Sequence, residues 1–566
     1  MSSFFDSASL VQIPSGYKVG TVYSVKPIDG DGDLTFTRSN DTATRVGPDG
    51  LIQKVRTNVF TYSQNLSNAA WKTVTDGGTI TKTANAGTAP DGTNTATRIQ
   101  IGGGGTYSLI YQDGVNPLGS VVISGYFKRY GGTNQTFRLF GDNGNAYSGN
   151  YTATNDWQRF SLSVSATSTG ADGFAADASN NASDILVWGM QLETGVLTDY
   201  IATTTTAVSV GPIADLPRLD YSGGATCPKL LLEPQRTNLA TYSEQFDNAD
   251  WLKRANIGIT ANAIVSPDGY TNADKMAATN DSVVDYGCFQ IVASQLNTFS
   301  VFAKKGEMNY LFIGYNNNYA SDGVFFNLNT GAISSNPSSY SATITDFGNG
   351  WYRCSVYFAT NVSYFFISPS VDGTSFNFSG QSGNGIYIYG AQAELGSYAS
   401  SYIPTIAAAS TKGEDAAYKT GIASLIGQTA GTIYAEFEYF GNTTGTLEIS
   451  PLYIGGGAYT NGVYIDIYQG NIYAVVFNGG VSQASINIGA LSVGNHKVAI
   501  AYAANDIVIY LDGTLGGVDT SATIPTMDKV YLGTVGSSTV IQKYTLNQAL
   551  LFKTRLTNAQ LAELTA

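Results

Sequence analysis

Apolar and polar residues alternate along most of this chain in short runs. In residues 463–468, apolar side chains alternate with Tyr464, Asp466 and Tyr468, so we expect these three to face away from a core. Clusters of Gly, Asn and Asp separate such runs, and only residues 557–564 suit a helix, with a Thr and a Gln at capping-box spacing. The pattern predicts an all-β protein of tandem antiparallel β-sandwich modules, jelly-roll or concanavalin-like, with a short terminal helix.

One block of sequence occurs twice. Residues 56–71 and 236–251 share Arg-Thr-Asn, then Thr-Tyr-Ser, Asn-Ala and Trp, at identical internal spacing. Matches continue downstream with a slowly growing offset, as loop insertions produce, and Phe127 there answers Phe302. A long repeat in register indicates two copies of one module. We expect the recurring tryptophans to lie in the module cores rather than to serve as platforms for sugar rings; they are Trp71, Trp251, Trp157 and Trp351.

The repeat and the proline distribution give the expected domain boundaries. An N-terminal attachment segment spans residues 1–34, and the first β-sandwich module spans 35–205. A proline-punctuated connector covers 206–229. The second module, 230–411, opens with a strand of three leucines, and a laminin-G/concanavalin-like sandwich fills 412–566.

Composition excludes several classes of function. Charged residues make up 13% of the chain, against about 25% in ordinary soluble proteins, and the net charge is −13. Because no run is rich in Lys or Arg, we expect no nucleic-acid partner. No apolar stretch approaches the roughly 18 residues of a membrane span, and we expect synthesis in a cytoplasm without a standard export signal. The three cysteines are too few for a disulfide framework and are predicted to be buried.

The first 34 residues differ from the rest. The segment is too short to bury its own apolar side chains, so we expect it to dock, either on its own domain or on a partner protein. If it docks on a partner, its removal should leave the modules folded but unattached. The candidate contact residues for that partner are Phe4, Phe5, Leu10, Ile13 and Tyr17.

Acidic residues alternate with glycines at 29–33. Such a run can wrap oxygen ligands around calcium, which makes Asp29, Asp31 and Asp33 candidate metal ligands. The other interpretation is a solvated Asp-Gly turn, because position 40, where an EF-hand needs Glu, is Asn. No other cofactor is expected.

Five stretches carry a resemblance to known families. Residues 13–27 and 33–46, together with the duplicated block at 230–251, resemble modules of bacteriophage head-fibre and tail-fibre proteins. Residues 498–513 and 555–561 resemble the laminin-G/concanavalin-like sandwich, which concerns fold and not ligand. The resemblance implies a virion structural protein that is made in a host bacterial cytoplasm and binds other virion proteins, of capsid or tail, through its N-terminal segment.

Catalytic residues are hard to find in this sequence. Glu193 and Glu394 recur at matching positions after buried strands, which favours a structural role with hydrogen bonds to the backbone. Glu436 and Glu438 share one strand face but lack a second element that would complete a glycosidase pair. The single histidine, His496, lies in a turn before a strand. We therefore expect no enzyme.

Binding is the better expectation. Aromatic residues that the two copies do not share are not required by the common fold, which makes them better candidates for binding a ligand. The candidates for glycan or subunit contact are Tyr315, Tyr319, Tyr459, Tyr464 and Tyr468.

These features together predict a bacteriophage head or tail fibre with modules for adhesion to host-surface glycan. A glycan depolymerase and a bacterial surface adhesin are the alternatives. Outward tyrosines and open sandwich edges, such as residues 472–477, are surfaces that another chain can bind. A closed symmetric oligomer covers them, so we expect a homotrimer, with a dimer as the second choice.

Overall fold

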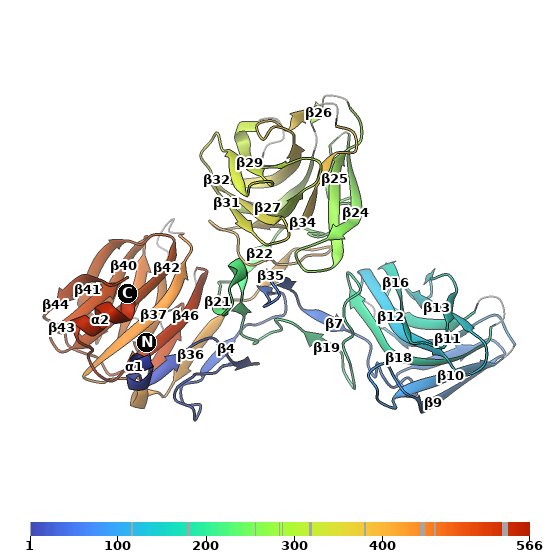
Figure 1. Cartoon of the computed structure of the whole chain (residues 1–566), viewed down its shortest axis with the longest axis horizontal. Helices are drawn as coiled ribbons and strands as arrows, with labels where there is room; N and C mark the ends of the chain where they lie inside the picture. Colours follow the sequence, from blue (N-terminus) through green and yellow to red (C-terminus); the bar gives the residue numbers. More distant parts are fainter. Residues whose placement is uncertain are drawn as a thin grey trace. The chain divides into compact units, whose positions relative to one another are not determined.

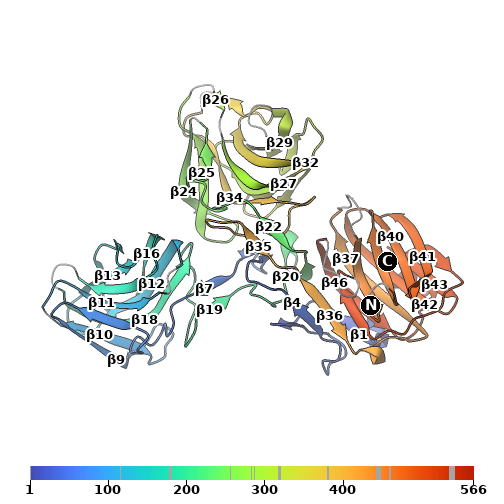
Figure 2. The ribbon, with the colours of Figure 1, turned by 180° about the vertical axis from the view of Figure 1, so that it is seen from behind.

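The computed structural model confirms an all-β chain in which antiparallel strands form packed sheets (Figures 1 and 2). It describes residues 2–102, 104–114, 117–177, 181–254, 256–281, 284–285, 287–315, 320–378, 381–441, 448–457, 460–534 and 542–566. No helix in these ranges is long and apolar enough to cross a membrane. Residues 55–211 form one compact unit, and residues 1–54 with 212–566 form another.

The unit of residues 55–211 is the first module, a sandwich of two sheets. Its first sheet runs in the order β16 (Gln158–Ala166), β12 (Gly119–Arg129), β18 (Ser183–Thr194), β10 (Ala96–Gly102) and β9 (Thr79–Gly87). Its second runs β14 (Ala146–Tyr147), β13 (Gln135–Gly141), β17 (Ala171–Ala176), β11 (Ser108–Asp113) and β8 (Lys72–Thr75), with β15 (Tyr151–Ala153) beside β13. β7 (Arg56–Asn58) pairs with β19 (Val208–Val210) where the chain enters and leaves the module.

The second module repeats this plan with longer strands. Its sheet runs β24 (Ile257–Val265), β25 (Thr271–Ala278), β34 (Gly385–Glu394), β27 (Cys288–Lys305), β32 (Trp351–Ser370), β28 (Tyr310–Gly314), β29 (Gly323–Asn327) and β30 (Ala332–Ser335). Shorter pairs add β23 (Leu252–Lys253), β31 (Ser341–Asp346), β22 (Arg236–Asn238) with β35 (Ser410–Lys412), and β26 (Val284–Asp285) with β33 (Asn377–Phe378). β27 and β32 continue through register shifts where the first module divides each into two strands, so one bent sheet supplies both layers.

The C-terminal sandwich has two large sheets around one core. The first runs β20 (Leu219–Asp220), β21 (Lys229–Leu232), β46 (Tyr544–Phe552), β37 (Ala430–Tyr439), β42 (Gly494–Ala503), β43 (Asp506–Leu511) and β44 (Thr514–Asp519), with β1 (Leu10–Gln12) beside β46. The second runs β2 (Tyr17–Lys18), β3 (Thr21–Val22), β4 (Leu34–Thr37), β36 (Ala416–Thr420), β45 (Lys529–Leu532), β38 (Glu448–Gly455), β39 (Gly462–Tyr468), β40 (Asn471–Asn478) and β41 (Val481–Ala490). The capping box predicted for α2 (Asn558–Thr565) is confirmed at Thr557 and Gln560.

The N-terminal residues are part of this C-terminal sandwich. Leu10 pairs with Leu551, and Figure 2 shows β1 beside β46 near the N terminus. Leu10, Val22, Leu34 and Phe36 are buried in the sandwich core. The expected boundary at residue 34 therefore moves, because β4 pairs with β36 and the first module begins near residue 55. The segment docks on the C-terminal sandwich of its own chain, whereas the sequence predicts docking either on the first module or on a partner protein.

Other expectations at the C-terminal sandwich also change. The three-leucine strand, β21, pairs with β46 instead of opening the second module. Val463, Ile465 and Ile467 belong to the sandwich core, so Tyr464 and Asp466 face away from it, as expected. Both are nevertheless nearly buried, at 3% and 8% exposed, which the alternation did not predict. Tyr464 packs against Tyr453 and Val475, which lie on the neighbouring strands β38 and β40 of the same sheet and cover it from solvent. Residues 472–477 are not an edge either, since β40 lies between β39 and β41.

The duplicated block makes the same hydrogen bonds in both copies. Asn58 donates to two backbone carbonyls at 3.1 and 2.8 Å, and Asn238 does so at 3.0 and 2.8 Å. Trp71 and Trp251 are buried, and each indole donates to a backbone carbonyl at 3.1 Å. The recurring residues are therefore the frame that closes each module, as expected for Trp71 and Trp251. Trp157, also expected in a core, is only partly buried and lies outside the main core of its module.

Removing residues 1–34 should destabilise the C-terminal sandwich rather than leave it intact. The deletion takes β1, β2 and β3 out of two sheets and exposes the core that Leu10, Val22 and Leu34 cover. We expect calorimetry to show one thermal transition shifted down by ten degrees or more, roughly what the loss of several buried side chains costs. An unchanged melting profile would contradict this role.

Candidate functional site

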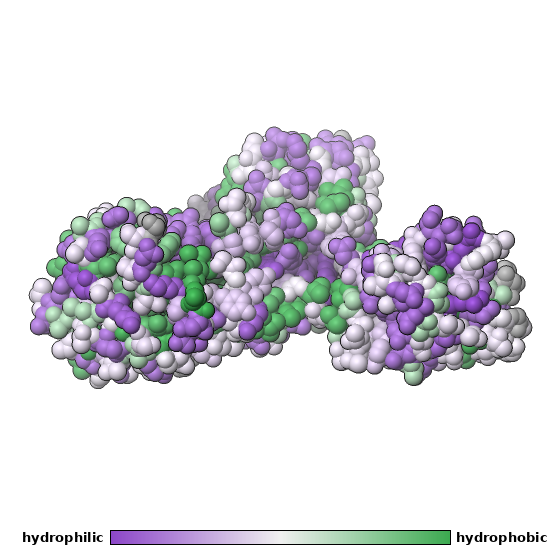
Figure 3. Space-filling view, turned by 60° about the horizontal axis from the view of Figure 1, so that its bottom comes forward, coloured by the Kyte–Doolittle hydropathy of each residue, from purple (hydrophilic) through white to green (hydrophobic). Residues whose placement is uncertain are grey.

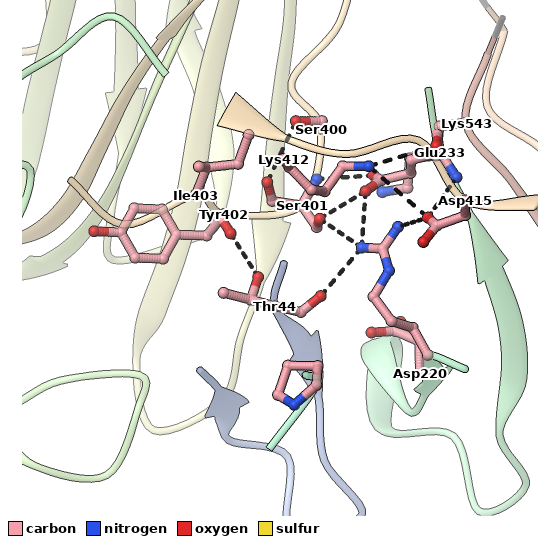
Figure 4. A network of polar contacts seen from close by, with 12 residues as sticks. Thr44, Asp220, Glu233, Ser400, Ser401, Tyr402, Ile403, Lys412, Asp415 and Lys543 are labelled. Atoms are coloured by element: carbon pink, nitrogen blue, oxygen red, sulfur yellow. Dashed lines mark hydrogen bonds and ion pairs between the residues drawn. The ribbon is translucent and has the colours of Figure 1, made fainter. Parts of the chain in front are cut away.

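Five buried charged side chains meet where the second module joins the C-terminal sandwich. We call this set the ionic junction: Arg38, Arg218, Glu233, Lys412 and Asp415. Each lies at or just beyond the end of a different strand, namely β4, β20, β21, β35 and β36. Figure 4 shows Glu233, Ser401, Lys412 and Asp415 converging from different parts of the chain.

Arg218 is the central member of the ionic junction. Its guanidinium donates to Glu233 Oε2 at 2.9 Å, to Ser401 Oγ at 2.7 Å and to Asp415 Oδ2. It also donates to the Thr44 carbonyl at 3.1 Å. One side chain of the connector therefore ties together the stretch before the first module, the end of β21, the end of the second module and the start of β36.

Arg38 holds the connector against the same carboxylate. It donates to Asp415 Oδ1 at 3.1 Å and to the carbonyls of Pro212 at 2.8 Å and Leu216 at 3.2 Å. Its side chain has no solvent exposure. A fully buried guanidinium is tolerated because its donors point at oxygen acceptors and its charge faces a carboxylate.

The pKa values at the junction move as burial and neighbouring charges require. Burial alone raises the pKa of Glu233 and Asp415, but Arg218 and Lys412 outweigh it and hold both below their ordinary values. Burial lowers the pKa of Lys412 to about 8. Carboxylates with a lowered pKa add stability above their unfolded pKa, about 4, and lose it as the pH falls through the folded value.

The ionic junction has no room for a substrate. The cavity beside it, lined in part by Thr44, Asp220, Ser401 and Tyr402, is ≈ 60 Å³. That volume holds a few water molecules and not a sugar ring. The carboxylates of the junction are bonded to cationic side chains and to backbone N–H groups, so the arrangement serves a structural role.

The carboxylates considered for catalysis are also bonded. Glu193 accepts the Thr198 N–H at 2.9 Å, and Glu394 accepts the Ser400 N–H at 3.1 Å, which confirms the expected backbone contact. Glu436 accepts from Gln548 at 2.8 Å, and Glu438 accepts from Lys229 at 2.8 Å.

The three aspartates at 29–33 do not converge. Asp29 accepts the Asp31 N–H at 3.0 Å, and Asp33 accepts from Ser24 N at 2.8 Å and Ser24 Oγ at 3.0 Å. Across the ranges that the structure describes, no group of three His, Cys, Asp or Glu side chains could hold a metal ion. The geometry is that of the Asp-Gly turn and not of the calcium site.

The predicted attachment residues separate into two groups. Phe4 and Leu10 are buried, and Phe4 packs edge-on against Phe552 in the chain's own core. Tyr17 is partly buried and accepts a hydrogen bond from Arg45 at 3.0 Å. Phe5 and Ile13 instead line an open groove.

This groove, which we call the N-terminal groove, is ≈ 680 Å³ in volume. Its apolar lining includes Ile28, which is 95% exposed, and Val25, which is 47% exposed. Asp6, Lys26 and Asp29 supply polar side chains along it. Figure 3 shows hydrophobic residues gathered in patches on the domain that carries the C-terminal strands. Exposed apolar side chains in such number are typical of a surface that binds another molecule.

The predicted ligand tyrosines do not form one site. Tyr319 and Tyr459 lie outside the described residues. Tyr315 contacts Tyr340, hydroxyl to hydroxyl at 3.4 Å, and packs against the second module's core. Tyr464 is buried, and Tyr468 is half-buried at the end of β39. The structure brings no two of the described ones together.

Sequence reasoning missed an aromatic cluster in the first module. Tyr126, Trp188 and Tyr200 have ring centroids 4.7–6.3 Å apart, and Trp157 packs with them. The second module repeats it with Phe302, Tyr389 and Tyr402, whose centroids are 5.8–6.0 Å apart, beside Trp351. Register makes Tyr126, and not Phe127, the counterpart of Phe302, since each pairs with an equivalent arginine. The signal that could have found it is the recurrence of aromatic residues at four matched positions.

The cysteines are mixed: Cys288 and Cys354 are buried as expected, whereas Cys227 is exposed. His496, placed in β42 rather than in a turn, has Nδ1 2.7 Å from Asp512 Oδ2.

Comparisons with known proteins give weak matches only. No protein-family model matches the sequence, and no curated protein matches it either. Solved structures that match parts of it include the Ruminococcus gnavus IT-sialidase CBM40, at 18% identity and a TM-score of 0.22, covering 25% of this chain and 86% of that one. The botulinum neurotoxin serotype D binding domain gives 13% identity and 0.21 over 26% and 40%, and a SAP-like pentraxin from Limulus polyphemus gives 13% and 0.19 over 24% and 68%. TM-scores this low carry no argument about ligand or function.

Breaking the ionic junction should destabilise the chain strongly. Asp415→Asn leaves Arg218 and Arg38 buried without their shared carboxylate, which costs about 3–5 kcal/mol. Urea unfolding followed by fluorescence measures this as an earlier midpoint for the C-terminal sandwich. The matched control is Asp506→Asn, whose carboxylate is 47% exposed beside Arg555 and should cost about 1 kcal/mol or less. Equal effects of the two substitutions would remove the special role of the junction.

Proposed function

We propose that this protein is a non-enzymatic fibre of a bacteriophage particle, of head or tail, that adheres to host-surface glycan. The sequence resemblance to phage fibre modules supports it, and the N-terminal groove is the observation that carries it. The residues of that resemblance include positions 13–27, which contribute Ile13, Val25 and Lys26 to the groove lining. A protein of the particle is the partner proposed for this surface.

The chemistry of the groove fits a protein segment as its occupant. The exposed Ile28 and Val25 offer apolar contact that water otherwise covers, worth about 25 cal/mol per Å² buried. Asp6, Asp29 and Lys26 supply a mixed polar rim, as interfaces between proteins usually have. The groove belongs to a domain whose core includes residues of β1 and β4, so a partner bound there is attached to a folded domain.

An adhesive role is favoured over a catalytic one by the state of the carboxylates. Glycan hydrolysis needs two carboxyl groups held free on either side of the scissile bond. Glu193 and Glu394 are each bonded within their own module, and Glu438 is paired with Lys229. Incubation with host polysaccharide is expected to leave its viscosity unchanged, and a fall in viscosity would establish the depolymerase alternative.

The proposed fibre is a homotrimer. Apolar side chains are exposed at the free edges of the C-terminal sandwich, on β41, on β44 and in the turn before β42. These are Val481, Val493, Leu515 and Val518, which are 49–68% exposed. Open edges with apolar side chains invite pairing with another chain, and a closed symmetric oligomer covers them. These exposed edges, and not outward tyrosines, are the surfaces that the trimer would cover.

Charge in the groove should block attachment to the particle. Ile28→Asp combined with Val25→Asp places two carboxylates in the apolar lining, and we expect at least a tenfold loss of the protein from purified particles. Val19→Asp is the control, since Val19 is 53% exposed in the same segment but does not line the groove. Circular dichroism verifies that all variants are folded. Normal incorporation of the double variant would place the attachment surface elsewhere.

Light scattering on the purified chain tests the oligomer. We expect a mass three times the 59.8 kDa of one chain at micromolar concentration. Val481→Lys with Leu515→Lys, at the edges of two sheets, should shift the mass toward the monomer. A wild-type mass of 59.8 kDa that does not change with concentration would refute the trimer, and twice that mass would favour a dimer.

A further inference from the structure

We propose that the aromatic cluster of the first module is the glycan site, and that it takes a neutral hexose ring. The inference rests on the proposed adhesive function and deepens it. It comes from a comparison of two copies of one module within the same chain, of which one has its site filled and the other has it open.

In the second module the chain fills this site with its own residues. Ile52, on β6 (Ile52–Gln53), packs on Phe302, Trp351, Tyr389 and Tyr402 and donates its N–H to the Pro267 carbonyl at 2.9 Å. All four aromatic residues are consequently 0–2% exposed. The segment before the first module thus occupies a site on the second one.

Lys54, two residues after Ile52, places a positive charge in the same site of the second module. Its Nζ lies 2.6 Å from Glu244 Oε1, 2.6 Å from Asp268 Oδ2 and 2.7 Å from the Tyr389 hydroxyl. The occupant of this copy is therefore an apolar side chain followed by a cation, matched by two carboxylates.

In the first module the same place is open. Tyr126, Trp157 and Tyr200 are only partly buried, in contrast to their counterparts. The turn glycines give a second observation: a Cβ added at Gly269 would meet Leu51 Cδ1 at 2.8 Å, but at Gly92 it would meet none of the described atoms within 4 Å. Both glycines follow the same Pro-Asp pair in equivalent turns, so the difference lies in the occupant.

The polar groups at the open copy differ in charge. Gln64 replaces Glu244 and directly follows Ser63, whose hydroxyl bonds the Tyr200 hydroxyl. Asp91 replaces Asp268 and is exposed, with Oδ1 accepting from Thr93 N at 2.9 Å and Thr93 Oγ1 at 2.7 Å. The first module therefore has one carboxylate fewer at this place, and it would attract a cation such as Lys54 less strongly.

A neutral sugar ring matches what remains. Its apolar face can lie on the partly open rings of Tyr126 and Trp157, and its hydroxyls can donate to the second oxygen of Asp91 and bond with the Gln64 amide. The rings are held in place beforehand: Trp157 Nε1 donates to the Thr88 carbonyl at 2.9 Å, and Ser63 Oγ lies 2.6 Å from the Tyr200 hydroxyl. A preformed platform of this kind lowers the ordering cost of binding.

The test is an array of bacterial-type oligosaccharides, neutral and anionic, probed with the full-length protein. We expect binding to neutral hexose glycans, with at least a tenfold loss of affinity in Asp91→Ala and in Trp157→Ala. Because Trp157→Ala removes packing, Gln64→Ala is the milder second variant, expected to lose three- to tenfold. Tyr107→Ala, at an exposed tyrosine of the same module outside the cluster, is the control and should bind as wild type.

The outcomes separate this inference from the proposed function. Glycan binding that Asp91→Ala, Trp157→Ala and Gln64→Ala all retain would overturn the site and leave adhesion standing, as would binding confined to anionic glycans. Loss of self-association in Asp91→Ala, seen as a lower mass without loss of glycan binding, would assign the cluster to a subunit contact instead. A wild-type protein that binds no glycan would overturn adhesion itself, and this site with it.

Discussion

The Arg218 guanidinium is shielded from water and held by Glu233 and Asp415, and this buried pairing determines how the larger unit is assembled. A charge in that position is costly unless its partners are fixed in place, and those partners lie at the ends of strands far apart in sequence. The unit can therefore form only when the N-terminal segment, the connector and the C-terminal sandwich come together. We infer that the junction specifies this one arrangement more than it adds to stability.

The two copies of the module have the same hydrogen-bonded frame, but their aromatic clusters differ in exposure to solvent. The hydrogen bonds of Asn58 and Asn238 match, and so do the burial and bonding of Trp71 and Trp251. The aromatic clusters beside them do not match in exposure, because residues 51–54 cover one copy. A module that binds its own chain has become part of the scaffold, while its duplicate keeps an open face.

The sequence predicted the fold class, the duplication and the capped helix α2 (Asn558–Thr565), because all three depend on local periodicity and spacing. It did not place residues 10–37 in the last domain, since pairing between strands more than 500 residues apart leaves no local signal. Alternation placed Tyr464 on the face away from the core, but it could not show that Tyr453 and Val475 of the adjacent strands cover this side chain from solvent. The aromatic cluster was missed because residues shared by both copies were assigned to the core, and a shared residue can also line a site.

Hydrogen exchange on the intact chain tests most directly whether the ionic junction makes one unit of these distant segments. Amides of β1, β4, β21 and β46 are predicted to exchange together, at the rate of the C-terminal sandwich core, and to lose protection together in Asp415→Asn. Amides of residues 55–211 should keep their own rate in both proteins. If β1 and β4 exchange freely while β46 stays protected, the N-terminal segment is a loosely docked arm and the account is contradicted.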